Sequence, residues 1–256
     1  MKIIYCYINI CLLMLLTGCS KEEAREGGAS LTMVHAVAGL GMLKTNFKGT
    51  DPIGYENATV LRYGAYTPTD NQFGLSAEQH RIGMFEMPDT LNSSQPRFLV
   101  DLHLEMGSIN TLYFIGTKES AEYVLRREEI PYYAATDSVM GLRFANLSPS
   151  KIPVQVRIRQ QGSSEWFQQG KILAYKDITS FQQYAVSSQA SPIYTIEFRN
   201  VETDELLADF TIEHGMGTGT SSEPNRWIYR NFTVALIGGE VNGLLPSPYQ
   251  VMVIRY

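Results

Sequence analysis

The chain has 256 residues, with 21 lysines and arginines against 26 aspartates and glutamates, so its formal net charge at pH 7 is −5. It shows no stripe of basic residues that could neutralise a phosphate backbone, which excludes nucleic acid as a partner. The densest basic positions, Arg126-Arg127 and Arg157 with Arg159, are expected on the solvent side of strands.

The N-terminus is typical of a secretory signal peptide. Lys2 is followed by an uncharged, apolar stretch from Ile3 to Leu16, and then the sequence turns polar at once. Spanning a bilayer takes roughly 20 apolar residues, so this stretch is too short for a transmembrane helix. A buried core helix is the alternative, but the basic start and the abrupt polar switch favour a signal peptide over residues 1–18.

A cysteine stands where this segment ends. The junction Leu16-Thr17-Gly18-Cys19 resembles the lipobox of bacterial lipoproteins, which implies cleavage before Cys19 and acylation of its thiol. Two or more fatty chains hold a protein stably on a membrane, so Cys19 is predicted to be the lipid anchor. The other two cysteines, Cys6 and Cys11, lie in the removed segment. Cysteine proteases, zinc ribbons and thiol redox sites are therefore excluded in the mature protein.

The residues that follow Cys19 resemble a localisation signal. Lys21, Glu22 and Glu23 resemble the export signal of Bacteroidota lipoproteins that are displayed on the cell surface. The alternative is that residues 19–29, which contain Gly27-Gly28, are only a solvated flexible tether. The resemblance implies a lipid-anchored outer-membrane protein that faces outward.

The rest of the chain has the pattern of short β-strands. Residues alternate between apolar and polar, with β-branched and aromatic side chains dominating, and Pro, Gly, Asn and Ser clusters break the pattern. The segment from Tyr123 to Ile130 is predicted to be mainly extended, although Thr117 or Ser120 could cap a helix there. The runs that show the alternation are "RFLVDLHLEMG" from Arg97, "VQVRIRQ" from Val154, "IYTIEF" from Ile193, "ADFTIE" from Ala208, "FTVALIG" from Phe232 and "YQVMVIRY" from Tyr249.

Four landmarks recur in the same order in the two halves. Their separation of 108 to 122 residues is that of domains, not of solenoid repeats. The sequence therefore predicts an all-β protein with two tandem antiparallel β-sandwich domains, residues 30–137 and 138–256. The matched pairs are Leu31 with Leu142, Met33 with Phe144, His35 with Asn146, Tyr55 with Tyr175, Asp101 with Asp209, and Gly116 with Gly238.

These landmarks resemble a known family. A strand of the form [VL]-x-[FMV]-[VA]-[HN]-[AL], then Tyr-x-x-[AI]-Thr, then an apolar strand ending in Gly, is similar to a tandem immunoglobulin-like or transthyretin-like family of unknown function in Bacteroidota lipoproteins. The resemblance covers residues 30–256. The second half departs from it by the long insertion "HGMGTGTSSEPNRW" before Ile228. The family implies a fold and an envelope location, and no activity.

No catalytic or metal-binding constellation is expected, and no cofactor. The four histidines lack helical ligand spacing, no G-x-S-x-G occurs, and "GMGTGT" from Gly215 lacks the Gly-Lys-Ser/Thr of a phosphate-binding loop. Glu105 and Glu213 occupy the same repeat position, so they are not expected to face each other as a glycosidase pair. His35, matched by Asn146, is expected to make a structural hydrogen bond.

Aromatic residues beside loops are the candidate binding residues. Trp166 and Phe167, and also Trp227 and Tyr229, suit stacking on sugars or docking on a protein. The alternative is that they cap the ends of the sandwich. Two tripeptides, Asp89-Thr90-Leu91 and Asp137-Ser138-Val139, resemble the O-glycosylation sequon of Bacteroidota envelope proteins.

The sequence thus favours a lipid-anchored, non-catalytic surface protein. Its partners would be the membrane, through the lipid on Cys19, and a glycan or a protein bound by the second domain's aromatics. The alternative is a structural or accessory subunit of an envelope assembly that pairs through an exposed strand edge.

Overall fold

The structure is a computed structural model, and it describes residues 27–49, 58–88, 94–186, 194–213 and 226–256. The predicted lipidation and export residues, Cys19, Lys21, Glu22 and Glu23, lie outside these ranges, as does Asp89-Thr90-Leu91. Within the described ranges, no helix is both long and apolar enough to cross a membrane.

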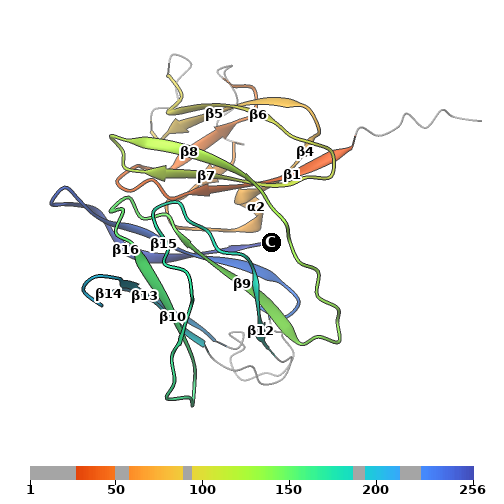
Figure 1. Cartoon of the computed structure of the whole chain (residues 1–256). Coiled ribbons are helices and arrows are strands. Elements are labelled where there is room, and N and C mark those ends of the chain that lie inside the picture. The colour runs from red at the N-terminus through yellow and green to blue at the C-terminus, as the bar shows by residue number, and fades with distance from the viewer. Residues whose placement is uncertain (1–26, 50–57, 89–93, 187–193, 214–225) are drawn as a thin grey trace, which may run out of the picture.

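The first half of the chain forms two four-stranded sheets (Figure 1). One has the order β4-β1-β7-β8 and the other β3-β2-β5-β6. A single turn of helix, α2 (Pro68–Asn71), leads into β4. The strands are β1 (Gly28–His35), β2 (Leu43–Asn46), β3 (Val60–Leu61), β4 (Gln72–Ser76), β5 (Gln79–Glu86), β6 (Phe98–His103), β7 (Ile109–Gly116) and β8 (Ala121–Arg127). The segment predicted to be mainly extended, Tyr123 to Ile130, lies in β8 as far as Arg127, and the helix alternative is wrong.

The second half repeats this plan. Its sheets have the orders β12-β9-β15-β16 and β11-β10-β13-β14, which match those of the first half strand for strand. The strands are β9 (Val139–Asn146), β10 (Val154–Gln160), β11 (Phe167–Gln168), β12 (Gln182–Ala185), β13 (Tyr194–Asn200), β14 (Leu206–Ile212), β15 (Asn231–Val241) and β16 (Leu244–Arg255). The all-β fold of two tandem sandwiches is confirmed. The predicted boundary at residues 137 and 138 falls in the segment that joins β8 to β9.

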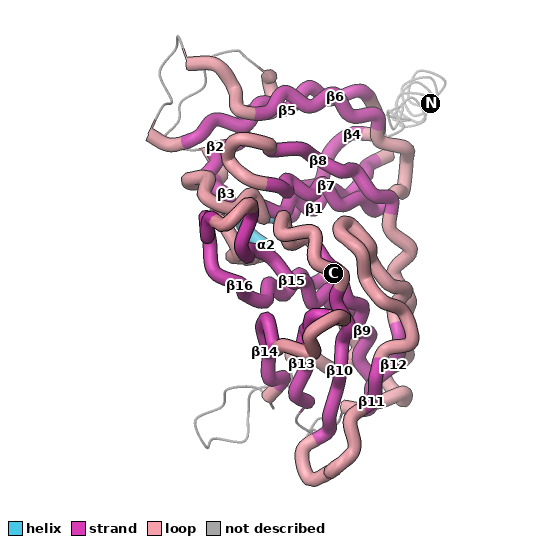
Figure 2. The backbone as a smooth tube through the Cα atoms, turned by 60° about the vertical axis from the view of Figure 1, so that its left-hand side comes forward, coloured by secondary structure: helices cyan, strands magenta, loops and turns pink. Residues whose placement is uncertain are grey.

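The two sandwiches are stacked face to face, so the molecule has four layers of sheet (Figures 1 and 2). Each sandwich has its own apolar core. A third cluster joins the inner sheets of the two halves, and its buried members are Val34, Ala36, Tyr113, Ile115, Ala145, Leu147, Ala235, Ile237, Met252 and Ile254. The sandwiches therefore share a buried apolar interface, which two independent tandem domains would not have.

This stacking explains why β1, β7, β9 and β15 are buried on both faces. Within the inner sheets, β1 pairs with β7 in parallel, and β9 pairs with β15 in parallel. Parallel pairs occur in proteins chiefly where both faces of a sheet are covered. The prediction of antiparallel sandwiches holds for the outer sheets, whereas each inner sheet contains one parallel pair.

The repeat register is confirmed at one landmark and corrected at another. Gly116 and Gly238 both have positive φ, 96° and 73°, and a Cβ at either site would come within 2.3 Å of a backbone oxygen. The equivalent of Tyr175, however, is Tyr63 and not Tyr55, which lies outside the described residues. The residue after each tyrosine has a positive φ and donates its N–H to an equivalent carbonyl: Gly64 to His35 at 3.0 Å, and Lys176 to Asn146 at 2.7 Å.

Candidate binding surfaces

The hairpin that joins β10 to β11 carries the most exposed of the predicted aromatics. In β10, buried Val154, Val156 and Ile158 alternate with outward-facing polar residues. The ring of Trp166 lies on one of these, with its centroid 4.5 Å from the guanidinium carbon of Arg159. Phe167 stands opposite Ile158 on the edge strand β11 and is 65% exposed. The loop between β10 and β11 forms the lowest described part of Figure 2, and β1, where the described chain begins, lies in the other sandwich.

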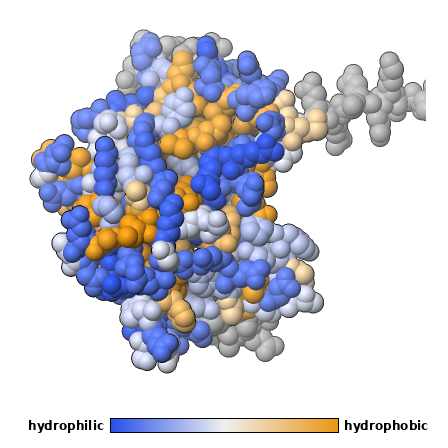
Figure 3. All heavy atoms as spheres, viewed as in Figure 1, coloured by the Kyte–Doolittle hydropathy of each residue, from blue (hydrophilic) through white to orange (hydrophobic). Residues whose placement is uncertain are grey.

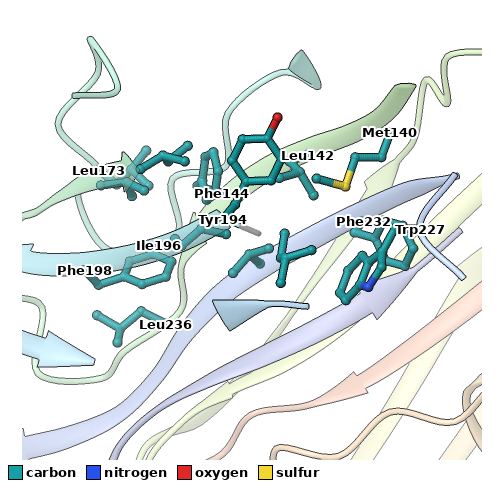
Figure 4. Close-up of a cluster of buried hydrophobic side chains, with 14 of the residues drawn as sticks. Met140, Leu142, Phe144, Leu173, Tyr194, Ile196, Phe198, Trp227, Phe232 and Leu236 are labelled. Atoms are coloured by element: carbon teal, nitrogen blue, oxygen red, sulfur yellow. The ribbon is translucent and has the colours of Figure 1, made fainter. Parts of the chain in front are cut away.

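Trp227 does not belong to a binding surface, so its prediction as a binding residue is wrong. It is 3% exposed and packs on Phe232, with ring centroids 4.4 Å apart (Figure 4). Its indole N–H donates to the carbonyl of Glu213 at 3.1 Å. The chain turns just before β15, and this turn directs the ring into the core. For Trp227, the alternative that it caps the end of the sandwich is correct.

Tyr229 is partly exposed, but its side chain is fixed by a hydrogen bond. Its hydroxyl donates to the carbonyl of Ala135 at 2.5 Å, in the segment that links the two sandwiches. Its backbone has a φ of 59°, which places it in the left-handed region of the turn. Because Trp227 is buried, the four predicted aromatics do not form one platform. Trp166 and Phe167 are the remaining adjacent pair, in which Phe167 is 65% exposed and Trp166 is half-buried against Arg159.

His35 and Asn146 play the shared structural role that their alignment predicted. Both are buried, and each accepts a hydrogen bond from the backbone N–H two residues later, Val37 to His35 Nδ1 at 3.4 Å and Ser148 to Asn146 Oδ1 at 3.2 Å. His35 Nε2 lies 2.8 Å from the carbonyl of Gly41. A backbone N–H can only donate and a carbonyl can only accept, so these contacts require the neutral ring with its proton on Nε2.

This histidine makes stability depend on pH. Burial lowers the pKa of His35 from 6.5 to about 4, against the opposing effect of its hydrogen bond to Gly41. Above pH 6.5 the ring is neutral in both states. Below pH 6.5 the ring is protonated in the unfolded chain but stays neutral in the native chain. The free energy of unfolding therefore falls until about pH 4.

Between pH 7 and pH 4, we expect the free energy of unfolding to fall by about 3 kcal/mol more in the wild type than in His35→Asn. The reason is that one pKa unit corresponds to about 1.4 kcal/mol. Asparagine is the residue that the second half uses at this position. The measurement is urea denaturation of both proteins at pH 7 and pH 4. Equal losses in the two proteins would show that His35 titrates normally in the native state.

Glu105 and Glu213 do not face each other. Glu105 follows β6 and Glu213 follows β14, and these strands belong to the outer sheets of different sandwiches. Glu105 is ion-paired with Arg127 on the surface. Across the described residues, no group of three or more histidine, cysteine, aspartate or glutamate side chains is placed to hold a metal ion.

A buried ion pair lies in the interface between the two sandwiches. Arg143, on β9, has a side chain 2% exposed, and it binds the fully buried carboxylate of Glu128 with both terminal nitrogens, at 2.6 and 2.7 Å. Its Nε donates to Thr233 at 2.7 Å, and Nη2 donates to the hydroxyl of Tyr256 at 2.8 Å. Glu128 comes just after β8, so this pair fastens the first sandwich to the second.

Aromatic rings complete the setting of this guanidinium. The guanidinium carbon of Arg143 lies 4.5 Å from the ring centroid of Phe181 and 5.1 Å from that of Tyr256. Burial raises the pKa of the neighbouring Tyr113 well above its ordinary value, so its hydroxyl stays neutral beside the pair. A planar cation held between rings and a bidentate carboxylate has little freedom to move.

A cleft of about 620 Å³ opens above this ion pair, at the waist between the two sandwiches. In Figure 3, strongly hydrophilic surface gathers near the waist, where the end of β8 approaches the second sandwich. The lining residues are Arg126, Arg127, Glu129, Ile130, Pro131, Arg143, Thr179, Ser180 and Phe181. The walls come from residues 126–131, Arg143 and residues 179–181, which no sequence motif connects. The sequence pattern predicts only that Arg126-Arg127 lies on the solvent side of a strand.

Comparison with known proteins adds little to this geometry. No protein-family profile matches the chain, and no curated protein matches it. A solved structure of a candidate adhesin from Bacteroides ovatus is 9% identical, covers 91% of this chain and 94% of its own, and has a TM-score of 0.25. A leucine-rich repeat protein from Bacteroides thetaiotaomicron is 10% identical over 73% of this chain and 24% of its own, with a TM-score of 0.15. Similarities at this level carry no argument about function.

Proposed function

We propose that this protein is a non-catalytic binding module of the adhesin type, held by the lipid on Cys19 at the surface of a Bacteroidota-type outer membrane. Its partner is a glycan or a protein. The observation that supports the proposal is the β10–β11 hairpin, which presents Phe167 in solvent beside a Trp166 ring stacked on Arg159.

The physical reason is the value of fixed aromatic rings in recognition. A partner that covers such a ring removes apolar surface from water, and a ring already held in place loses little conformational freedom. Arg159 holds Trp166, and the rigid sheet beneath holds Arg159. The hairpin belongs to the second sandwich, whereas β1, to which the predicted tether leads in the sequence, belongs to the first.

Replacing Trp166 and Phe167 together by alanine tests the proposal. We expect the affinity for the partner to fall by about tenfold or more, because central aromatic anchors contribute at least 1–2 kcal/mol each to binding. The full chain in detergent is applied to immobilised glycans and envelope proteins. Tyr123→Ala removes a half-exposed aromatic from β8 and is the matched control, expected to bind as the wild type does. A double variant that binds equally well would contradict a role for the hairpin.

The strand-edge alternative has one observation in its favour. β6 is an edge strand of an outer sheet, and Leu99 on it is exposed. Leu99, Asp101 and His103 all lie on the exposed face of β6, and Asp101 is ion-paired with Arg81. Charges on an edge strand discourage pairing with another chain. The alternative therefore predicts oligomers that Leu99→Lys abolishes, and size-exclusion chromatography of both proteins separates the two functions.

A further inference from the structure

We propose that the cleft at the waist of the molecule is a second binding site, specific for an acidic saccharide, whose carboxylate is held by Arg126 and Arg127. The site uses none of the residues of the β10–β11 hairpin. It extends the proposed function from binding in general to a class of ligand.

The exposed guanidinium groups of the cleft are the groups that could hold an anionic ligand. Three arginines line the cleft, Arg126, Arg127 and Arg143, and the one acidic side chain among the lining residues is Glu129. Arg143 and Arg126 share the buried carboxylate of Glu128, and Arg127 is paired with the exposed Glu105. The cleft therefore offers an anion the solvent-facing sides of Arg126 and Arg127, whose side chains are 39% and 63% exposed, and no net positive charge. Guanidinium groups match the geometry of a carboxylate better than any other side chain.

The hydrogen bonds leave one donor unused. Both oxygens of Glu128 accept hydrogen bonds from Arg143 at 2.6 and 2.7 Å. Arg126 Nε lies 3.3 Å from the same carboxylate, yet it is buried and donates to no acceptor. A buried donor without an acceptor is costly. Nε itself is buried, but the Arg126 side chain as a whole is 39% exposed, so a carboxylate entering the cleft can reach its terminal nitrogens.

The other walls favour a sugar ring over a simple anion. Phe181 lies on the Arg143 guanidinium, and Ile130 and Pro131 add apolar surface to the lining. The C–H face of a pyranose packs on such surfaces, while the exposed Ser180 offers a hydroxyl to the ring substituents. A volume of about 620 Å³ falls within the range of about 300–1,000 Å³ that is usual for small-ligand sites.

The test is calorimetric titration of the full chain in detergent with oligogalacturonate, and with a neutral oligogalactose of the same length. We expect the acidic sugar to bind and the neutral one not to bind. Arg126→Gln with Arg127→Gln should weaken binding by about tenfold or more, because hydrogen bonds to charged groups are strong. Ser180→Glu leaves the arginines in place and should block binding by placing a negative charge in the wall.

The matched control is Arg62→Gln with Arg81→Gln, which removes two surface arginines from ion pairs elsewhere in the first sandwich. This control removes the same total charge as the cleft variant, but outside the cleft. It should therefore bind the acidic sugar within about twofold of wild type. The hairpin variant with Trp166 and Phe167 replaced should also bind it normally, so failure of the hairpin and failure of the cleft are distinguishable. Absence of binding, equal binding of the neutral sugar, or equal losses in the cleft and control variants would overturn the proposal.

Discussion

Replacing Glu128 by alanine is expected to lower the free energy of unfolding by about 3–5 kcal/mol. The change leaves the Arg143 guanidinium buried in the interface without its carboxylate, and the remaining contacts with Thr233 and Tyr256 carry no negative charge. An uncompensated buried charge is among the costliest defects in a folded protein. Urea denaturation of wild type and variant at pH 7 gives the difference directly.

The matched control is Glu105→Ala. Glu105 pairs with Arg127 on the surface, where an exposed ion pair contributes about 0–1 kcal/mol. If Glu128→Ala costs no more than this control, the pair does not fasten the sandwiches. Removing both partners, with Arg143→Met added to Glu128→Leu, should recover much of the loss, because paired apolar replacements of buried ion pairs are often neutral.

Trp227→Ala is expected to lower the free energy of unfolding by about 3–5 kcal/mol, the usual range for removing a buried tryptophan. The ring packs against Phe232 and Phe210, and its N–H donates a hydrogen bond to the carbonyl of Glu213. Trp166→Ala is the control and should lower the free energy of unfolding by only about 1 kcal/mol or less, since its ring is half-buried against Arg159 and lies outside the apolar core. These are the two tryptophans of the chain, so fluorescence reports each separately: the emission that remains in Trp166→Ala should be blue-shifted. Equal costs for both would contradict the burial of Trp227.

The strand content, the duplication and the shared role of His35 and Asn146 could be predicted because each depends on local pattern. Alternation along "VQVRIRQ" is the direct consequence of a sheet with one buried face. The stacking of the two sandwiches left a weaker signal. "TLYFIG" and "FTVALIG" are nearly continuous apolar runs, which indicates strands covered on both faces.

The binding surfaces were harder to foresee. Position beside a loop does not reveal the direction of a side chain, so Trp227 and Trp166 looked alike in the sequence although one ring is buried and the other lies on the surface. The cleft depends on tertiary contact between the end of β8, β9 and the segment before β12. No spacing rule connects Arg126 to Phe181, and their proximity follows from the buried pair of Arg143 and Glu128.

Retention of intact cells on a surface coated with the partner tests the proposed function most directly. Cells that carry the wild-type chain should stay bound after washing. Cells that carry Cys19→Ser should detach, because the protein has lost its lipid anchor. Cells with Trp166 and Phe167 replaced by alanine should detach although the protein remains on them. If cells with either change are retained as well as wild type, the protein is not a lipid-anchored module that binds through the β10–β11 hairpin.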